Sequence, residues 1–439
     1  MQCALNNGGD LVLSDVLTTR IAIVSAVYPP EPVVSAGMSR DIARYLAKSS
    51  EVSVIVLHPP PSRPEGSKFL AAKYSSSSPE WPTDGINEYS LDSYTNPKSN
   101  ISGRLLESFD FGRRAVRALR NIKPKPDAIY VNTWPMASQW MLASFCHSHD
   151  IPLIMHVMDL YPETLLARFP SPTHPFLLKM GTALDQRLAK RASRIVLPAL
   201  SMRDNYVSTR ELEPQSTTWI PSWVDDEHFR DEPTKVVAGS TYDVPTESFN
   251  YIFLGNIGYL AGVDFLISSF CVSPQQGTSL IIAGDGAFRR SAMNHAKSLG
   301  DENIYFVSDP EASATPFLLA LGDVAVLPMK KDAGLSSTPS KLISYMLAGK
   351  PVVASVDAKS EAAELIRAAD CGWVGPPEDQ AWLSSTLDAV ARLDPAELAE
   401  RGRRGQAFAK AAFSRSVGIA RMVDLIKTAA SMAVDGKGK

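Results

Sequence analysis

Short apolar runs alternate along the chain with segments whose apolar residues recur every three or four positions. The first run, RIAIVSAVY at 20–28, is continuous, which is typical of a strand buried on both faces of a parallel sheet. Residues 39–48 have helical spacing, and a second apolar run follows at 51–57. This order predicts a right-handed βαβ unit in a doubly wound sheet.

The alternation continues through most of the chain. Further strands are expected at 127–133, 152–159, 194–198, 251–255, 279–284, 303–308, 323–328 and 351–355. Helices are expected between the later strands at 261–272, 287–299, 314–322, 339–348 and 359–369. Residues 58–108 are rich in Pro and Ser, and we expect them to form a surface excursion.

Two such series in one chain predict two α/β domains. A polar, turn-rich stretch at 230–250 places the break between them at about 222–250. We therefore expect an extension at 1–19, a first domain at 20–225 and a second at 235–412. An amphipathic helix is expected at 414–432 with no strand after it, and a lone helix of this kind must dock on another element.

Composition narrows the class of protein. The length of 439 residues exceeds what one core supports, and 45% hydrophobic with 21% charged residues indicates a globular chain. The net charge of −3 gives no support for a general nucleic-acid binder. Four widely spaced cysteines without a CxxC pair disfavour a disulfide scaffold and a zinc ribbon, and favour a reducing cytosol. We expect no signal peptide, no membrane-spanning helix and no metal.

Two glycine-rich turns follow neighbouring strands of the second series. They are GNIG, with Gly255, Asn256 and Gly258, and GDG, which spans Gly284, Asp285 and Gly286. Glycines allow tight backbone turns, and the N-terminus of a following helix offers free N–H groups to an anion. Each turn alone could simply need glycine, but the pair favours a ligand site.

A third segment, GLSSTPSKLISYMLAGKPV, combines several groups that bind phosphate. Its expected helix starts near Pro339 and presents the hydroxyls of Ser336 and Ser340 with the ammonium of Lys341. A helix dipole, hydroxyl donors and one positive charge suit a diphosphate. The alternative is a well-capped surface helix with a solvated lysine.

Taken together, these blocks resemble the family 4 glycosyltransferases. The resemblance rests on the GNIG turn, LIIAGDGAFRRSA, NIYFVS, DVAVLP and PSKLISYMLAGKPVVAS, and on YPPEPVVSAGMSRDIARYL, HVMDLYPETLL and IPSWVDDEHF in the first half. It implies the α/β GT-B fold, with two Rossmann-like domains facing each other across a cleft. It also implies that the first domain binds the acceptor, that the second binds a nucleotide sugar, and that helix 414–432 packs back on the first domain.

The resemblance also implies site residues. Donor binding is carried over to Gly255, Asn256, Gly258, Gly284, Asp285, Gly286, Val307, Leu335, Ser336, Ser340, Lys341, Ser344 and Glu361. Catalytic roles fall on Asp159, His156 and Lys341, and acceptor binding on Ser35, Ala36 and Gly37 in the loop at 30–37. His156 could instead be structural, and Asp159 could instead cap the helix that follows it.

The chain departs from the family pattern at the donor site. Asn256 and Ala261 occupy positions where many members carry Arg and Lys. Ser336 and Ser344 occupy the positions of two glutamates spaced E-x7-E. These differences leave Lys341 as the leading cation for a diphosphate and leave the contacts to ribose and sugar open.

The expected activity is transfer of a sugar, with retention, from a nucleoside diphosphate to a glycan or lipid-linked acceptor in polysaccharide biosynthesis. UDP is the favoured nucleotide, and no cofactor is expected. The GNIG and PSKL variant resembles a bacterial polysaccharide-assembly branch. The alternatives are a pseudoenzyme that acts as a binding subunit and a sugar-nucleotide epimerase. A NAD-dependent dehydrogenase is disfavoured, because no G-x-G-x-x-G with a downstream acid follows the first strand.

A basic helix is expected at 111–123. Arg113, Arg117 and Arg120 share one face, opposite an apolar face of Val116, Leu119 and Ile122. Such a helix can lie on anionic lipid, which would place a cytoplasmic enzyme at the inner face of the membrane. The alternative is the solvated outer face of a helix that covers the sheet.

Overall fold

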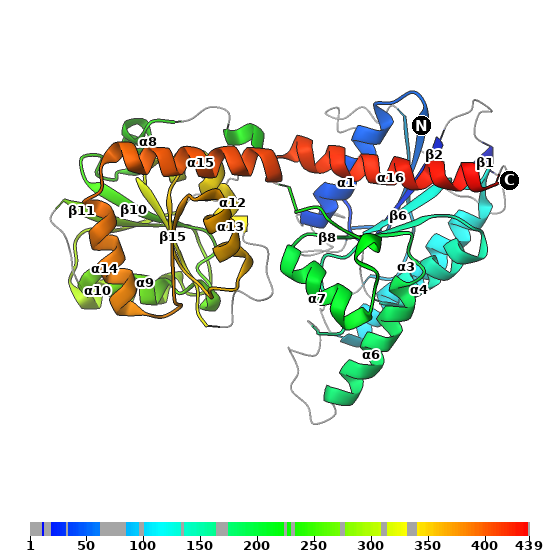
Figure 1. Ribbon diagram of the computed structural model, residues 1–439, viewed down its shortest axis with the longest axis horizontal. Helices are drawn as coiled ribbons and strands as arrows, with labels where there is room; N and C mark the ends of the chain where they lie inside the picture. Colours follow the sequence, from blue (N-terminus) through cyan, green and yellow to red (C-terminus); the bar gives the residue numbers. More distant parts are fainter. Residues whose placement is uncertain are drawn as a thin grey trace. The chain divides into compact units, whose positions relative to one another are not determined.

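The computed structural model describes residues 11–12, 19–31, 34–61, 85–95, 101–132, 136–163, 174–223, 226–229, 233–272, 277–308, 314–331 and 340–437. The chain divides into two compact units, each built around its own parallel sheet (Figure 1). One consists of Met1–Ser222 with Gly418–Lys439, and the other of Trp223–Val417. We call them unit 1 and unit 2.

The sheet of unit 1 has the strand order β4-β3-β2-β6-β7-β8-β9, and every neighbouring pair is parallel. Its strands are β2 (Thr19–Ser25), β3 (Val52–His58), β4 (Ile86–Ser90), β6 (Ala128–Asn132), β7 (Leu153–His156), β8 (Arg194–Leu197) and β9 (Thr217–Trp219). The strand order reverses between β2 and β6. At such a switch point the loops leave the sheet in opposite directions, which is where ligands bind in open α/β sheets.

The helices of unit 1 pack on this sheet. They are α1 (Val34–Ala47), α3 (Ile101–Asn121), α4 (Met136–Ser148), α6 (His174–Ala189) and α7 (Leu200–Arg210). Phe111 and Leu119 of α3 and Leu142 of α4 share one buried core with Ala22 and Val24 of β2. A minor sheet pairs β1 (Leu11–Val12) with β5 (Ile122–Lys123), and α16 (Arg415–Lys437) ends the chain with a buried apolar stripe that includes Met422 and Ile426.

Three expectations for the first half are wrong in their bounds. The excursion expected at 58–108 contains β4, which pairs with β3, and the start of α3 at Ile101. Strand β4 reads INEYS and has no buried residue, so it lacks an apolar run. The basic helix expected at 111–123 is the second half of α3, which ends at Asn121. Helix α1 begins at Val34, so Ser35, Ala36 and Gly37 lie in a helix and not in a loop.

The sheet of unit 2 has the order β12-β11-β10-β13-β14-β15 and is also parallel throughout. Its strands are β10 (Phe249–Leu254), β11 (Thr278–Ala283), β12 (Ile304–Val307), β13 (Val324–Pro328), β14 (Val352–Ser355) and β15 (Gly372–Gly375). Its helices are α8 (Lys235–Tyr242), α9 (Val263–Val272), α10 (Arg289–Leu299), α11 (Thr315–Ala320), α12 (Ser340–Leu347), α13 (Glu361–Ala369), α14 (Gln380–Ala391) and α15 (Pro395–Phe413). The switch point lies between β10 and β13.

Short 3-10 turns also occur at η1 (Pro214–Ser216), η2 (Asp226–Phe229) and η3 (Tyr259–Ala261). Helix α8 lies in the stretch at 230–250 that the sequence predicted to be polar turns. The hydroxyl of Thr234 accepts a hydrogen bond from the Val237 N–H and so caps the helix. Lys235 in the first turn binds Asp323 at 2.5 Å. Lys235 also donates to the carbonyl of Ser248 at 2.6 Å, so the cap and this lysine both help to hold the helix.

A buried arginine fixes the chain that follows β7. Arg210, the last residue of α7, is fully buried and donates to Asp185 at 2.9 Å, to Glu163 at 2.8 Å and to the carbonyl of Tyr161 at 2.7 Å. Its guanidinium lies 4.8 Å from the ring centroid of Tyr206. Burial would raise the pKa of Glu163, but the hydrogen bonds and charge of Arg210 outweigh it and lower that pKa.

We expect Arg210→Leu to destabilise unit 1 by about 3–5 kcal/mol, because it leaves the buried Asp185 carboxylate without its cation. Urea denaturation followed by circular dichroism measures the change. Arg203→Leu on the same helix is the matched control, since Arg203 is partly exposed and bonds to the Thr217 hydroxyl. Equal losses in the two variants would contradict a special role for the buried cluster.

Candidate functional site

Two backbone turns are joined at the carboxyl edge of the unit 2 sheet. The Ile257 N–H, in the turn after β10, donates to the carbonyl of Asp285 at 2.8 Å, and the Phe288 N–H donates back to the carbonyl of Ile257 at 3.0 Å. The Gly284 N–H extends the ladder to the carbonyl of Val307 at the end of β12, at 2.9 Å. The glycine turns expected at 255–258 and 284–286 therefore form one continuous backbone surface.

The glycines are required by close approach. Gly284 has φ of 129°, and a Cβ there would lie 2.2 Å from the carbonyl oxygen of Gly255. Gly255 has φ of 144°, and a Cβ there would lie 2.4 Å from Cε of Lys341. Any larger residue would push the turns apart and displace the lysine.

Lys341 brings a positive charge to this surface. It lies in the first turn of α12, and its Nζ donates to the carbonyl of Asn256 at 3.2 Å. The ammonium also lies 4.5 Å from the ring centroid of Phe253, in a cation–π contact. Burial lowers the pKa of Lys341 to about 8. The carbonyl of Asn256 and the ring of Phe253 thus both position the Lys341 ammonium, which is only partly hydrated.

Tyr345 anchors α12 on the end of β10, a role that was not predicted from the sequence. Its hydroxyl accepts from the Leu254 N–H at 3.0 Å and donates to the Leu254 carbonyl at 2.9 Å. Tyr345 follows Lys341 by four positions, so both side chains project from the same face of the helix. The spacing of four residues between Lys341 and Tyr345 is the feature of the sequence that could have predicted this role. The phenol is fully buried, and the contact fixes where the lysine can reach.

The remaining expected donor residues of this edge differ in exposure. Asn256, Asp285 and Ser340 are exposed, and Asp285 Oδ1 accepts from the Gly286 N–H at 2.7 Å. The Ser344 hydroxyl donates to the carbonyl of Ser340 at 3.2 Å, within its own helix. Gly258 is half-buried and Val307 is buried. Leu335 and Ser336 lie outside the described residues.

Glu361 is separated from this cluster by β13, because it begins α13 after β14. Its side chain is 6% exposed, and its Oε1 has no hydrogen-bond partner in the described part of the chain. Burial, with a smaller contribution from the charge of Glu364, raises its pKa to about 7. It is a buried carboxyl whose charge changes near neutral pH.

Hydrogen bonds from the carboxyl edge of the unit 1 sheet hold the start of α1 in place. Asn132, at the end of β6, donates to the carbonyl of Ser35 at 2.8 Å and to the hydroxyl of Ser39 at 3.1 Å. The Ser39 hydroxyl also lies 2.9 Å from that of Ser25, at the end of β2. This anchoring at the switch point was not expected from the sequence. None of the described residues has an atom within 4 Å of where a Cβ of Gly37 would lie.

The two candidate catalytic residues of unit 1 differ in accessibility. His156 is fully buried, and its Nδ1 lies 2.8 Å from the hydroxyl of Tyr130. Burial lowers its pKa to about 4, so it is neutral at physiological pH, which favours the structural interpretation. Asp159 is exposed in the turn after β7, directly before the segment that Arg210 holds. The structure therefore does not bring His156 and Asp159 to the same surface.

Within the described ranges, no three His, Cys, Asp or Glu side chains gather as a metal site would require. None of the described helices is long and apolar enough to cross a membrane. The unit 2 edge offers the Lys341 ammonium, backbone donors and a helix N-terminus, which is the chemistry of an anion site.

The family models match most of the chain in two parts. Residues 38–228 match the model described as "Glycosyltransferase Family 4", and residues 248–392 match "Glycosyl transferases group 1". "Probable glycosyltransferase WbjE" of Pseudomonas aeruginosa is 23% identical over 56% of this chain and 61% of its own length. "Putative colanic acid biosynthesis glycosyl transferase WcaI" of Escherichia coli is 21% identical over 43% of this chain and 46% of its own.

The chain thus spans about half to three-fifths of the length of these curated relatives. Among solved structures, HepE of Anabaena, described in complex with UDP and glucose, has a TM-score of 0.63 and 17% identity. That match covers 93% of this chain and 99% of HepE, and it shows the fold. The chain therefore belongs to the family 4 glycosyltransferases and has their two-domain α/β GT-B fold.

Proposed function

We propose that the protein is a retaining glycosyltransferase that moves a sugar from UDP to a glycan or lipid-linked acceptor. The observation that carries the proposal is the position of the Lys341 ammonium over the joined turns of Gly255 and Gly284. A diphosphate placed there would receive one charge-assisted hydrogen bond, with the first N–H groups of α12 nearby. The crystal structure of HepE with UDP and glucose supports the choice of nucleotide.

The proposed reaction needs no dedicated base on the protein. The bond between the sugar's anomeric carbon and the diphosphate oxygen breaks, and the acceptor oxygen bonds to that carbon on the same face. The acceptor's proton passes to the departing diphosphate. Lys341 and the helix dipole stabilise the charge that develops on the diphosphate, which is where such electrostatic help lowers the barrier. No metal or cofactor is part of this proposal.

The acceptor class is also proposed. The names of the curated relatives refer to glycosyl transfer and, for WcaI, to colanic acid biosynthesis, which supports a role in assembling a bacterial polysaccharide. Asp159 in unit 1 and the open space at Gly37 are the proposed acceptor-side positions. Incubation with UDP-sugars and candidate acceptors, followed by mass spectrometry, tests the transfer. Proton NMR of the same mixture detects an epimerised donor, the product expected from an epimerase, because the epimer has the donor's mass but different ring couplings.

One observation favours the pseudoenzyme alternative. Ser344 stands where the family carries a glutamate, and its hydroxyl is already bonded within α12. Tight UDP binding with neither hydrolysis nor transfer across a donor panel would support a binding subunit. Glu361, like Asp285, is an expected donor residue with a carboxyl group, and its position after β14 makes it the candidate to bind a sugar hydroxyl.

We expect Lys341→Ala to weaken UDP binding by about 1.5–3 kcal/mol, the range for a charge-assisted hydrogen bond. Isothermal titration calorimetry measures the change. Lys297→Ala on the exposed face of α10 is the control and should bind like the parent. Parental affinity in the Lys341 variant would remove this lysine from the diphosphate site.

The same contact predicts a pH dependence. Because the pKa of Lys341 is about 8, its charge is lost as pH rises through that value, and UDP affinity should fall with it. Phosphate groups lose their second proton at about pH 6, so UDP itself does not titrate there. Lys341→Arg keeps its charge and should give a flat profile. A parental profile that is flat between pH 7 and 9 would contradict the assignment.

Glu361 makes a separate prediction on stability. Its folded pKa of about 7 lies above the usual value of 4.5, so the folded state holds the proton more tightly. Its contribution to stability is present in full below pH 4.5 and is lost as pH rises through 7. Glu361→Gln should therefore melt higher than the parent at pH 8 and alike at pH 4. Glu364→Gln, exposed one turn later, should move the transition to lower pH without abolishing it.

The packing of α3 limits how this helix could bind a membrane. Leu119 and Ile122 are buried in the core, and Val116 packs against it, so the apolar face is not free to enter lipid. Arg113, Arg117 and Arg120 are exposed and could bind anionic lipid only by charge. We expect binding to anionic vesicles to disappear at high salt and in the triple Gln variant, and no binding to neutral vesicles. Salt-resistant binding would require another surface.

A further inference from the structure

Four successive residues at the carboxyl end of β10, at 253–256, each contact one of two side chains that lie one turn apart on α12. Lys341 contacts the first, third and fourth of them, through a ring, a glycine and a carbonyl. Tyr345 contacts the second, Leu254, through both of its backbone polar groups. The end of β10 is therefore joined to α12 by one charged and one neutral side chain.

Leu254 lies where β10 loses one of its two neighbouring strands. The pairing of β10 with β11 continues to Leu254, whereas its pairing with β13 ends at Ile252. The Gly255 N–H donates to the carbonyl of Ala283 in β11, so the N–H and carbonyl of Leu254 point to the opposite side, that of β13. Main-chain polar groups without partners are unfavourable, and the Tyr345 hydroxyl serves both groups. The hydroxyl thus occupies the place of the missing strand.

A phenol hydroxyl can do this because it donates and accepts at the same time. The Tyr345 hydroxyl accepts from the Leu254 N–H at 3.0 Å and donates to the Leu254 carbonyl at 2.9 Å. Burial raises the pKa of the phenol, so it keeps its proton at neutral pH. A phenylalanine would retain the packed ring and lose both hydrogen bonds. The substitution Tyr345→Phe therefore removes this link and little else.

Other contacts hold α12 in the fold. Leu342, Ile343 and Met346 are buried, and the Gln406 amide of α15 donates to the carbonyl of Leu347, the last residue of α12, at 3.0 Å. The helix therefore has support that does not depend on the Tyr345 hydroxyl. What the hydroxyl adds is the bond between α12 and the end of β10.

We propose that the Tyr345 hydroxyl positions Lys341 for the diphosphate of the donor, by holding the end of β10 against α12. The phenol is fully buried, so it acts through the lysine and does not touch the donor. The strength of a charge-assisted hydrogen bond depends on distance and angle, and loosening residues 253–256 would disturb both. The inference rests on the proposed function and adds a positioning residue to the proposed donor site.

Two measurements on the full chain test the proposal. Calorimetry with UDP at a series of pH values reports donor affinity. Partial acetylation with acetic anhydride, followed by mass spectrometry, reports the pKa of Lys341 without a ligand, because only the neutral amine reacts. The exposed Lys297 in the same digest corrects for the reactivity of the reagent. The groups that contact the Lys341 ammonium, the Asn256 carbonyl and the Phe253 ring, do not titrate.

We expect Tyr345→Phe to bind UDP roughly fivefold more weakly at pH 7, the net effect of about one hydrogen bond. Burial lowers the pKa of Lys341 to about 8 in the parent, and a lysine that no longer packs on the turn is better hydrated. The acetylation midpoint should therefore rise toward the ordinary value of 10.5. The fall of UDP affinity with pH should move to higher pH by the same amount.

Tyr251→Phe is the matched control. Tyr251 also lies in β10, is 1% exposed and donates through its hydroxyl to the carbonyl of Leu387 in α14. The same substitution thus removes a buried phenol hydrogen bond from the same strand, away from the lysine. This variant should melt lower than the parent and keep the parental UDP affinity and the parental Lys341 midpoint. Circular dichroism verifies that both variants are folded at the temperature of the measurements.

A double-mutant cycle tests whether Tyr345 acts through the lysine. If it does, Tyr345→Phe should change UDP affinity little in protein that already carries Lys341→Ala. Equal effects of Tyr345→Phe in the two backgrounds would contradict the proposal, because the hydroxyl would then act on another part of the site.

The proposal is also overturned if Tyr345→Phe retains the parental midpoint of Lys341, whatever its UDP affinity, or if Tyr251→Phe shifts both measurements as strongly. A parent protein that does not bind UDP would refute the proposed donor. The acetylation profiles would still decide whether Tyr345 positions Lys341, since they need no ligand. The two failures are therefore distinguishable.

Discussion

The candidate donor site depends on the close packing of the Lys341 side chain against Gly255, which has no side chain of its own. The Lys341 side chain packs so closely on Gly255 that a Cβ at position 255 would clash with it. Its ammonium donates to the carbonyl of Asn256. The turn itself is held by the ladder from Gly284 to Val307. A cation is thus placed by main-chain geometry, which costs little reorganisation when an anion arrives.

In both units a buried polar side chain ties a helix to the end of a strand at the switch point, but the side chain is of a different type in each. In unit 2 a buried phenol, Tyr345, ties α12 to the end of β10. In unit 1 an amide, Asn132, ties the start of α1 to the end of β6. Each anchor sits where strand order reverses and satisfies polar groups that the diverging loops would otherwise leave exposed. Helix N-termini are therefore fixed at the sheet edges where ligands are expected.

Burial shifts the pKa values of Lys341 and Glu361 toward neutral pH. It lowers the pKa of Lys341 to about 8 and raises that of Glu361 to about 7, so both groups respond to small changes in their surroundings. With Asp285, they are the ionisable groups among the expected donor residues. Ala261 is itself buried, so a lysine could not simply be restored there.

The sequence by itself determined the alternation of strands and helices, because buried parallel strands need continuous apolar runs. It also determined the glycine turns, since their backbone shape excludes other residues, and the helix that carries Lys341. It could not reveal β4, an edge strand without a buried residue, or the start of α3, where Leu105 and Phe109 are exposed and the helical stripe is weak. The sequence also placed Ser35 in a loop, whereas it lies in α1.

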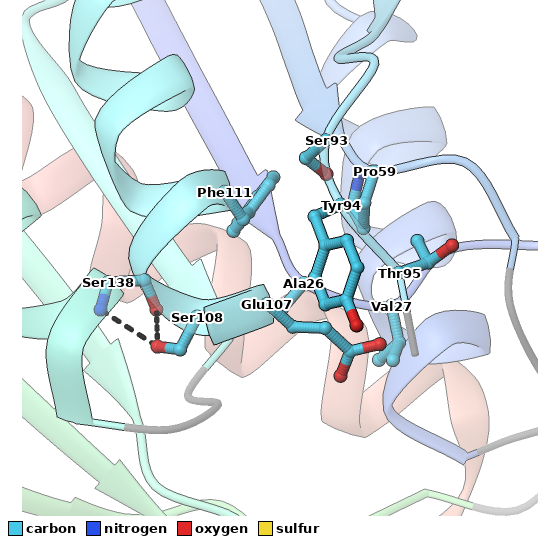
Figure 2. Close-up of a pocket in the computed structure, with 10 residues that line it drawn as sticks. All are labelled: Ala26, Val27, Pro59, Ser93, Tyr94, Thr95, Glu107, Ser108, Phe111 and Ser138. Atoms are coloured by element: carbon cyan, nitrogen blue, oxygen red, sulfur yellow. Dashed lines mark hydrogen bonds between the residues drawn. The ribbon is translucent and has the colours of Figure 1, made fainter. Parts of the chain in front are cut away.

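Only the tertiary structure decided which polar side chains meet. The burial of His156, the link between Tyr345 and β10, and the cluster around Arg210 all join residues from separate elements. The pocket drawn in Figure 2 is lined by five described segments of unit 1 that lie between residues 26 and 138. Strand and helix periodicity is a local property, whereas burial, hydrogen-bond partners and pKa arise from neighbours that only the folded chain brings together.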